Sequence, residues 1–496
     1  MKKLFFAYLA LILLGCASQS SKLLSMSKGC ETLSSDLDYI HESMNANFSG
    51  TTHDPELRQN AQAVFLEEKS HVLQCRSEID AQRSLRKYFA TFHDPHVKAV
   101  WNGIARYGNL VETSSGKKTN SIRSFPLVAT GVYVRNLGGR FFIRKIDSGL
   151  LKDTKVQVND ELLSCDGKSA QQILEQGILP FEPVSAKEAA QYRMTPLIFI
   201  RWDQLAGSQI MCLFKRGEKN IPQAFLWQTV PENYLATKFE MPAAKIYEIE
   251  KISQGHWVKL RSFSGYDKDG IAQLKQFAED AKKLREDKVI VVDVRGNTGG
   301  SSIWGTHWIE NLYGYHVDSA NGEALVLASP GNHGHFKRVH ESLLKQGSIQ
   351  PEDEARWSRL LEAAKELPGK LVKVDDSKPE KMMKQSLPKI FKGKIYVLTD
   401  FMVFSSGEMF VSELKMMPHV KQVGMATNAS TYYSDIRFDI TPSGLVFNFP
   451  TMVELEPESH RASGEPLVPE IQLFLKPQIE IQGRDSLREQ VLKMKL

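Results

Sequence analysis

The stretch Val289-Ile290-Val291-Val292-Asp293-Val294-Arg295-Gly296-Asn297-Thr298-Gly299-Gly300 decides the fold of this chain. Its first six residues are apolar apart from Asp293, a pattern typical of a buried strand in a parallel sheet. Three glycines then predict a tight loop whose backbone N–H groups are open to a ligand. Because ligands of α/β sheets bind beyond the carboxyl ends of strands, this loop is a candidate site. An ordinary strand–turn–helix connection is the alternative.

A second strand pattern precedes a serine. Lys394-Ile395-Tyr396-Val397-Leu398-Thr399-Asp400 is followed by Phe401-Met402-Val403-Phe404 and then by Ser405-Ser406-Gly407-Glu408. A serine at a strand-to-helix turn lies where a helix N-terminus offers free N–H groups, which suits a nucleophile whose product is an oxyanion. The alternative is a capping box, in which Ser405 and Glu408 only terminate the helix.

Together these two stretches resemble the S41 family of serine peptidases, which includes the C-terminal processing (tail-specific) proteases and the tricorn core protease. The first resembles the family's Asp-Leu-Arg-x-Asn-x-Gly-Gly loop, and Ser405-Ser406-Gly407-Glu408 resembles its Ser-Ala-Ser-Glu segment. The resemblance implies an α/β multidomain fold with a helical N-terminal region, a PDZ-like β domain and an α/β catalytic domain of spiral β-β-α (ClpP/crotonase-like) type. It also implies a serine-type peptidase that requires no metal or organic cofactor.

The segment Asp94-Pro95-His96 resembles the family's Asp-Pro-His-Thr segment, with Val97 in place of the hydroxyl residue. The resemblance makes His96 the general base for the nucleophile Ser405, while His93 is a nearby competitor outside the matching position. The tail-specific branch uses a lysine downstream of the serine, and Ser430 stands at that position here. The resemblance therefore favours the tricorn-like variant, in which a histidine is the base.

The resemblance also implies an orienting acid and an oxyanion hole. Glu465 lies near the family's downstream acidic residue, and Glu458 is the alternative. The N–H groups of Ser406 and of Gly299 or Gly300 are the expected oxyanion donors.

Residues from about 125 to 226 follow a different pattern of short strands. The run from Val156 to Lys168 resembles the PDZ segment in which two turns flank a strand. A PDZ domain adds a peptide as an extra strand and captures its terminal carboxylate, here near Gly131. A PDZ-like spacer without a ligand is the alternative. Gly131, Arg295 and Asn297 are the candidate substrate-binding residues.

The N-terminus has the features of an export signal. Lys2-Lys3 precede an apolar run, and Leu13-Leu14-Gly15-Cys16 resembles a bacterial lipobox. The resemblance implies lipid attachment at Cys16, and Ala17 after it favours the outer membrane over the inner one. We therefore expect a lipoprotein of the bacterial cell envelope on the periplasmic side. An ordinary signal peptide with a chance cysteine is the alternative.

Composition narrows the partners. The net charge of +5 and the 24% of charged residues are too small and too dispersed to favour a nucleic-acid partner, so we expect protein or peptide substrates. Four cysteines follow Cys16, and an even number in an exported chain predicts disulfides. We expect Cys30–Cys75 and Cys165–Cys212, since each pair falls in one expected domain, although three connectivities are possible. Buried free thiols are the alternative.

The expected domains are a lipoprotein signal peptide (1–15), a tether (16–29), a helical N-terminal domain (30–120), a PDZ-like domain (121–228) and an S41 peptidase domain (229–480) with a charged helical insertion at about 311–388. The expected function is a lipid-anchored serine endopeptidase. A catalytically inactive S41-like binding or scaffold protein is the alternative, because Val97, Gly407 and Ser430 depart from the family pattern.

Overall fold

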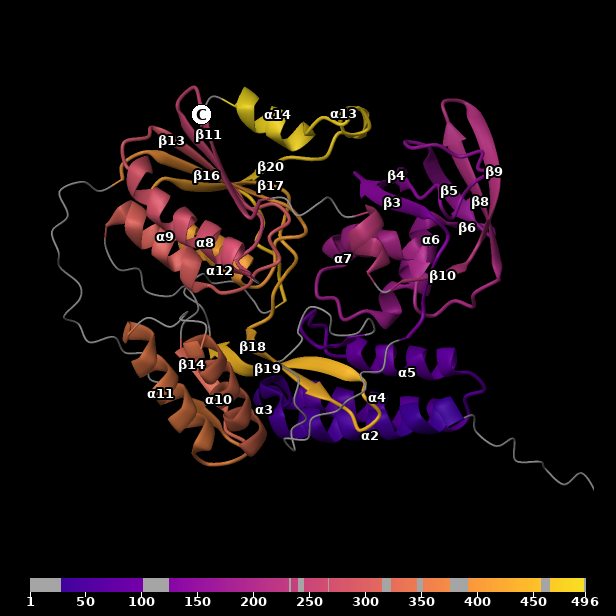
Figure 1. The fold of residues 1–496 in the computed structure, drawn as a ribbon, viewed down its shortest axis with the longest axis horizontal. Coiled ribbons are helices and arrows are strands. Elements are labelled where there is room, and N and C mark those ends of the chain that lie inside the picture. The colour runs from indigo at the N-terminus through magenta and orange to yellow at the C-terminus, as the bar shows by residue number, and fades with distance from the viewer. Residues whose placement is uncertain are drawn as a thin grey trace, which may run out of the picture.

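The structure is a computed structural model, and it describes residues 28–100, 125–231, 233–239, 245–265, 267–314, 323–345, 351–374, 391–455 and 464–494. The expected signal peptide, the lipobox cysteine Cys16 and most of the tether lie outside these residues. Within them, no helix combines the length and the apolar character needed to cross a membrane. Figure 1 shows a large α/β domain, a smaller β domain beside it and a helical layer below both.

The large domain contains a six-stranded sheet in the order β11-β12-β13-β16-β17-β20. Its strands are β11 (Tyr247–Ile252), β12 (Gly255–Leu260), β13 (Val289–Asp293), β16 (Lys394–Thr399), β17 (Val420–Gly424) and β20 (Ile471–Gln472). All neighbours pair in parallel except β11 with β12. The two strands expected from the apolar runs are thus confirmed, and they lie next to each other.

Both faces of this sheet are covered, which is why its central strands are continuous apolar runs. Val292 and Val397 point to the face that packs against three helices, whereas Val291 and Leu398 point to the face under the C-terminal helix. The helices on the first face are α8 (Lys268–Asp280), α9 (Ile303–Tyr313) and α12 (Ser406–Lys415), with the short η4 (Ala281–Leu284). The opposite face carries α14 (Ser486–Lys493), which follows the short α13 (Pro477–Glu480).

The smaller β domain is built on a second sheet in the order β3-β4-β5-β8-β9, with β6 added to β5. Its strands are β3 (Val132–Leu137), β4 (Arg140–Ile146), β5 (Glu161–Cys165), β6 (Lys168–Ser169), β8 (Gln209–Arg216) and β9 (Lys219–Leu226). A small sheet of β2 (Leu127–Ala129), β7 (Ile200–Arg201) and β10 (Gln228–Val230) adjoins it. The helical segments of this part are α6 (Ala170–Gly177), η1 (Leu179–Phe181), α7 (Lys187–Met194), η2 (Thr195–Ile198) and η3 (Leu235–Phe239).

The helical N-terminal region does not stand alone. Its elements are α2 (Lys28–Asn47), α3 (Ser49–His53), α4 (Pro55–Leu73), α5 (Glu78–Ala90) and β1 (Lys98–Val100). Strand β1 pairs with the distant strand β19 (Val446–Leu455), with Lys98 opposite Asn448. The helices share one apolar core with Phe447 and Phe449 of β19, so segments far apart in the sequence form one layer.

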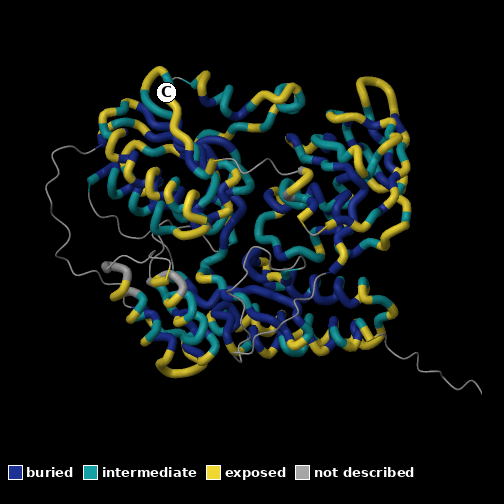
Figure 2. The backbone as a smooth tube through the Cα atoms, viewed as in Figure 1, coloured by how far each residue is buried: buried dark blue, intermediate teal, exposed yellow. Residues whose placement is uncertain are grey.

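The expected insertion at about 311–388 joins the same layer. It supplies β14 (Glu323–Leu327), α10 (Pro330–Lys345), α11 (Pro351–Lys365) and β15 (Leu371–Lys373). Strand β14 pairs with β19, and β18 (Tyr433–Ile440) pairs with the same strand. Figure 2 shows the buried backbone concentrated in the sheets and on the inner sides of the helices. The described part of the segment is therefore a structural part of this layer.

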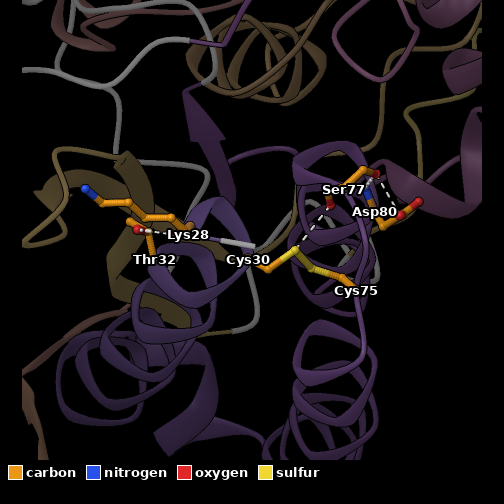
Figure 3. Close-up of a disulfide and its surroundings, with 6 residues drawn as sticks. All are labelled: Lys28, Cys30, Thr32, Cys75, Ser77 and Asp80. Atoms are coloured by element: carbon orange, nitrogen blue, oxygen red, sulfur yellow. Dashed lines mark hydrogen bonds between the residues drawn. A yellow bond between two sulfur atoms is a disulfide. The ribbon is translucent and has the colours of Figure 1, made fainter. Parts of the chain in front are cut away.

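Both expected disulfides are confirmed. Cys30 of α2 is bonded to Cys75, which follows α4, and Figure 3 shows this bond beside Ser77, which caps α5. Cys165 and Cys212 are bonded across the paired strands β5 and β8.

The first disulfide is expected to stabilise the helical layer. It closes a loop with a sequence separation of 45 residues. Closing a loop of that length raises the free energy of the unfolded chain by about 4 kcal/mol at 25 °C, because the chain loses conformational entropy. The double variant Cys30→Ser/Cys75→Ser should therefore unfold at a lower urea concentration. A reducing agent, which also breaks Cys165–Cys212, should lower the midpoint of the native chain at least as far. An unchanged unfolding midpoint would contradict this expectation.

Candidate active site

The turn between β16 and α12 holds Ser405 in an unusual backbone conformation, with φ 54° and ψ −130°. Positive φ is costly for a residue with a side chain and persists where the surroundings enforce it. Ser405 directly precedes α12, yet its side chain makes no capping hydrogen bond. The capping-box alternative is therefore wrong, and Ser405 Oγ is not occupied by its own helix.

The glycine loop after β13 lies directly against this turn. Gly299 has a φ of +97°, and a Cβ there would lie 2.9 Å from the Cβ of Ser405 and 3.0 Å from the backbone nitrogen of Ser406. Only a glycine allows this approach. The backbone N–H of Phe404 donates to the carbonyl of Asn297 at 3.0 Å. The two stretches singled out in the sequence therefore form one site.

The backbone donors at this contact are of two kinds. The N–H of Gly299 donates to Asn297 Oδ1 at 2.9 Å, so it is already occupied. The N–H groups of Ser406 and Gly300 have no acceptor among the residues that the structure describes. The hydroxyl of Ser406 donates to the carbonyl of Gly300 at 2.7 Å, which ties the two together. Of the two expected glycine donors, Gly300 is the one the geometry favours.

His96 reaches the site from the helical layer, between α5 and β1. Its ring centroid lies 4.4 Å from that of Phe404, the residue before Ser405. His96 Nδ1 is 3.1 Å from Asp94 Oδ1, an ion-pair distance, although the N–H is not aligned on that oxygen as a hydrogen bond. No hydrogen bond joins the His96 ring to Ser405 Oγ in the described parts. Such bonds often tighten only when substrate is bound.

Asp94 is the carboxylate that the structure places beside His96. It is fully buried, its Oδ1 also accepts the backbone N–H of His96 at 2.8 Å, and its Oδ2 accepts the hydroxyl of Thr431 at 2.7 Å. The sequence alone indicates no role for Asp94, although it begins the Asp-Pro-His segment. Glu465 is exposed, and among the described residues the carboxylate paired with His96 is that of Asp94. The role of Glu465 as orienting acid stays a prediction.

Glu465 nevertheless lies next to the loop that flanks the nucleophile, because the N–H of Gly464 donates to the carbonyl of Ser430 at 3.2 Å. The alternative acid, Glu458, lies outside the described residues.

Glu408 holds the loop that contains Ala429 and Ser430. Its buried carboxylate accepts the backbone N–H groups of Ala429 and Ser430 at 2.9 and 2.6 Å, and it also accepts the hydroxyl of Thr427. The hydroxyl of Ser430 in turn accepts the N–H of Ser405 at 2.7 Å. The residue that stands at the lysine position of the tail-specific branch thus holds the backbone of the nucleophile. The Ser-x-x-Glu spacing alone suggests a helix cap and does not predict that Glu408 binds the loop at Ala429 and Ser430.

The three candidate substrate-binding residues have structural partners. Arg295 donates to Asp293 and to Asp485, which fastens α14 to the glycine loop. Asn297 is fully buried and shapes the loop through Gly299. Gly131 precedes the edge strand β3, and its φ of +89° allows a turn there. The role of all three residues in substrate binding stays a prediction.

The carboxylate of Asp293 is held ionised in the interior. Burial alone would raise its pKa, but the hydrogen bonds and charges of Arg295 and Arg261 hold the pKa of Asp293 well below its usual range. Removing either guanidinium would leave a buried charge only partly compensated, which strongly destabilises a protein. The glycine loop is thereby fixed at its base.

One group outside this region could hold a cation by its residue types. Glu67, Glu68 and His71 of α4 bring their side-chain ligand atoms together. The ammonium group of Lys87 contacts the two glutamates at 2.9 and 2.6 Å, so both carboxylates already share a cationic partner.

Comparison with known proteins supports the fold. No protein family matches the sequence, and no curated protein matches it. The crystal structure of mature CPAF matches with a TM-score of 0.64 at 14% identity, covering 94% of this chain and 97% of that one. The chain has the fold of CPAF. The structure of mature CPAF complexed with lactacystin matches with a TM-score of 0.63 at 14% identity, covering 94% of this chain and 98% of CPAF.

A third match is the photosystem II D1 C-terminal processing protease. Its identity is 12%, it covers 91% of this chain and 94% of that chain, and its TM-score is 0.38. A TM-score this low does not indicate a shared fold.

Replacing Asp94 tests which carboxylate orients His96. Asp94→Asn keeps the shape of the side chain but removes the charge beside Nδ1, so we expect the rate of fluorophosphonate labelling of Ser405 to fall about a hundredfold or more. Glu465→Gln, measured in parallel, reports the role predicted for Glu465. A full labelling rate in Asp94→Asn with a large loss in Glu465→Gln would assign the orienting role to Glu465.

Replacing Ser430 tests how the nucleophile is held. Ser430→Ala leaves the N–H of Ser405 without its acceptor, and an unsatisfied buried donor costs about 1–3 kcal/mol. We expect a labelling rate about tenfold lower, with secondary structure retained by circular dichroism. Ser434→Ala, on the neighbouring strand β18, is the control. Equal labelling rates in the two variants would show that Ser430 does not position Ser405.

Proposed function

We propose that this chain is a serine endopeptidase that hydrolyses peptide bonds through an acyl-enzyme. The observation that carries the proposal is the strained serine Ser405 at a strand-to-helix turn, with Gly299 against it and the His96 ring against the preceding residue, Phe404. A serine suits a nucleophile when its backbone is held in a costly conformation, its hydroxyl does not cap its own helix and a histidine lies near its turn. The S41 resemblance of the sequence and the fold shared with CPAF agree with this proposal.

The reaction would follow acyl-transfer chemistry. Ser405 Oγ attacks the peptide carbonyl carbon, and His96 Nε2 takes the hydroxyl proton. The negative charge on the carbonyl oxygen is stabilised by the N–H groups of Ser406 and Gly300, donors of a kind worth about 3 kcal/mol each. His96 returns its proton to the leaving amine, and Asp94 stabilises the imidazolium in between. Water then releases the acyl group by the same steps.

We further propose that the enzyme is a lipoprotein of the bacterial cell envelope, anchored through Cys16 and facing the periplasm. The lipobox-like sequence supports the anchor, and two disulfides agree with an oxidising compartment. The small β domain would bind protein or peptide substrates in a PDZ-like manner. Its edge strand β3, which pairs only with β4 among the described strands, supports this role.

Fluorophosphonate labelling of the purified protein, with mass spectrometry to locate the adduct, tests the proposal. We expect an adduct on Ser405, because an activated serine attacks the phosphorus as it would a carbonyl. The adduct should be lost in Ser405→Ala and reduced about a hundredfold or more in His96→Ala, which lacks the base.

Other outcomes would point elsewhere. An adduct that forms at full rate in His96→Ala would mean that another group is the base, with His93 tested next. A folded protein that forms no adduct would contradict the peptidase and favour the binding or scaffold protein.

A further inference from the structure

Two cationic side chains from different domains lie beside the proposed active site. Lys98 is the first residue of β1, two residues after His96. Val97 and Ala99 are buried in the apolar core of the helical layer. Lys98 lies opposite Asn448 of β19, whose neighbours Phe447 and Phe449 belong to that core, so the side chains of Lys98 and Asn448 point away from it. Asn448 Nδ2 donates to the carbonyl of His96, which places this face of the pair on the side of His96.

Lys98 has an environment unusual for a surface lysine. Lys98 is exposed to solvent. The protein around its ammonium group displaces part of the surrounding water, and this desolvation, together with the charge of Arg193, lowers the pKa of Lys98. The carboxylates within electrostatic reach are Asp94 and Glu182. Each of these carboxylates already has another partner: Asp94 contacts His96, and Glu182 is bound to Arg86.

Arg193 belongs to the last turn of α7 in the small β domain. Burial lowers its pKa to about 10, which the charge of Glu182 only partly offsets. Its Nη1 is buried and has no hydrogen-bond partner among the described residues. A buried guanidinium nitrogen without an acceptor is costly, and the cost is removed when an anion binds there.

The segment that carries Arg193 faces the nucleophile turn. Ser185 donates a hydrogen bond to the carbonyl of Ala429, next to Ser430. The ring centroid of Tyr192 lies 5.8 Å from that of Phe401, four residues before Ser405. Figure 1 shows α7 on the side of the small β domain that faces the six-stranded sheet. Arg193 and Lys98 therefore approach the site from two domains.

We propose that Lys98 and Arg193 together bind a carboxylate of the substrate and so give the peptidase a preference for acidic peptides. Two cations that repel each other without a dedicated anion between them form a site that an incoming anion stabilises. The position of Lys98 two residues from His96 places this carboxylate close to the scissile bond. It is either an Asp or Glu side chain or the C-terminal carboxylate of the peptide. The inference rests on the proposed peptidase function.

The test uses the full chain in detergent and matched peptides built around a bond that it cleaves in denatured casein. Each flanking position in turn carries Glu or Gln, and each peptide is made with a free or an amidated C-terminus. We expect kcat/KM to be about tenfold higher for the Glu peptide at one position, or for the free C-terminus over the amide. The first result identifies a side-chain carboxylate and the second a terminal one.

The variants Lys98→Met and Arg193→Met should each bring this ratio close to one, while their rates on the peptide without the carboxylate stay near that of the native chain. Lys168→Met, an exposed lysine on β6, is the control and should keep the full ratio. Lys98→Met changes an exposed side chain, so it keeps the test valid if Arg193→Met does not fold. A Glu-to-Gln and acid-to-amide ratio near one in the native chain, or a ratio unchanged in both variants, overturns the proposal.

A native chain that neither cleaves casein nor labels with a fluorophosphonate would contradict the proposed function separately. The Glu and Gln derivatives of one fluorescent casein-derived peptide, each with a free or an amidated end, would then be compared by fluorescence anisotropy. Tighter binding of a carboxylate form that is lost in Lys98→Met would support the carboxylate site. Equal binding of all forms would overturn it.

Discussion

The close approach of Gly299 to the turn that carries Ser405 is the constraint on which the rest of the site depends. Gly299 lies so near Ser405 that a single added carbon would collide with it. The contact fixes where the glycine loop and the nucleophile turn meet, and both sit at the carboxyl ends of adjacent parallel strands. The strain at Ser405 is tolerated because its surroundings leave the turn no other arrangement: Gly299 lies against it and Ser430 accepts its N–H.

Around that contact the chain assembles the site from several separate parts. The large domain provides the serine and the backbone donors, and the helical layer provides His96 and Asp94. The small β domain reaches the flanking loop through Ser185. Each contribution is secured by buried polar groups, such as Glu408 under the loop and Asp293 at the base of the glycine stretch. Satisfied polar networks of this kind specify one geometry more sharply than apolar packing does.

The sequence predicted what local patterns encode. Two apolar runs gave adjacent strands, and the glycine and serine stretches came together as expected. Cysteine positions predicted both disulfides. The sequence did not predict contacts that depend on side-chain direction. Asp94 precedes His96 by two residues, and the turn between them brings the carboxylate of Asp94 to the His96 ring. The partnership of Arg295 with Asp485 spans 190 residues and leaves no local trace.

Strand β1 has a consequence for when the site can exist. It delivers His96 only by pairing with β19, whose residues follow Lys98 by hundreds of positions, and contacts so distant in sequence form late and slowly because a long loop must close first. A chain still emerging from a ribosome has its histidine but not the strand that positions it. The approach of His96 to the Ser405 turn therefore forms only after β19 has been synthesised.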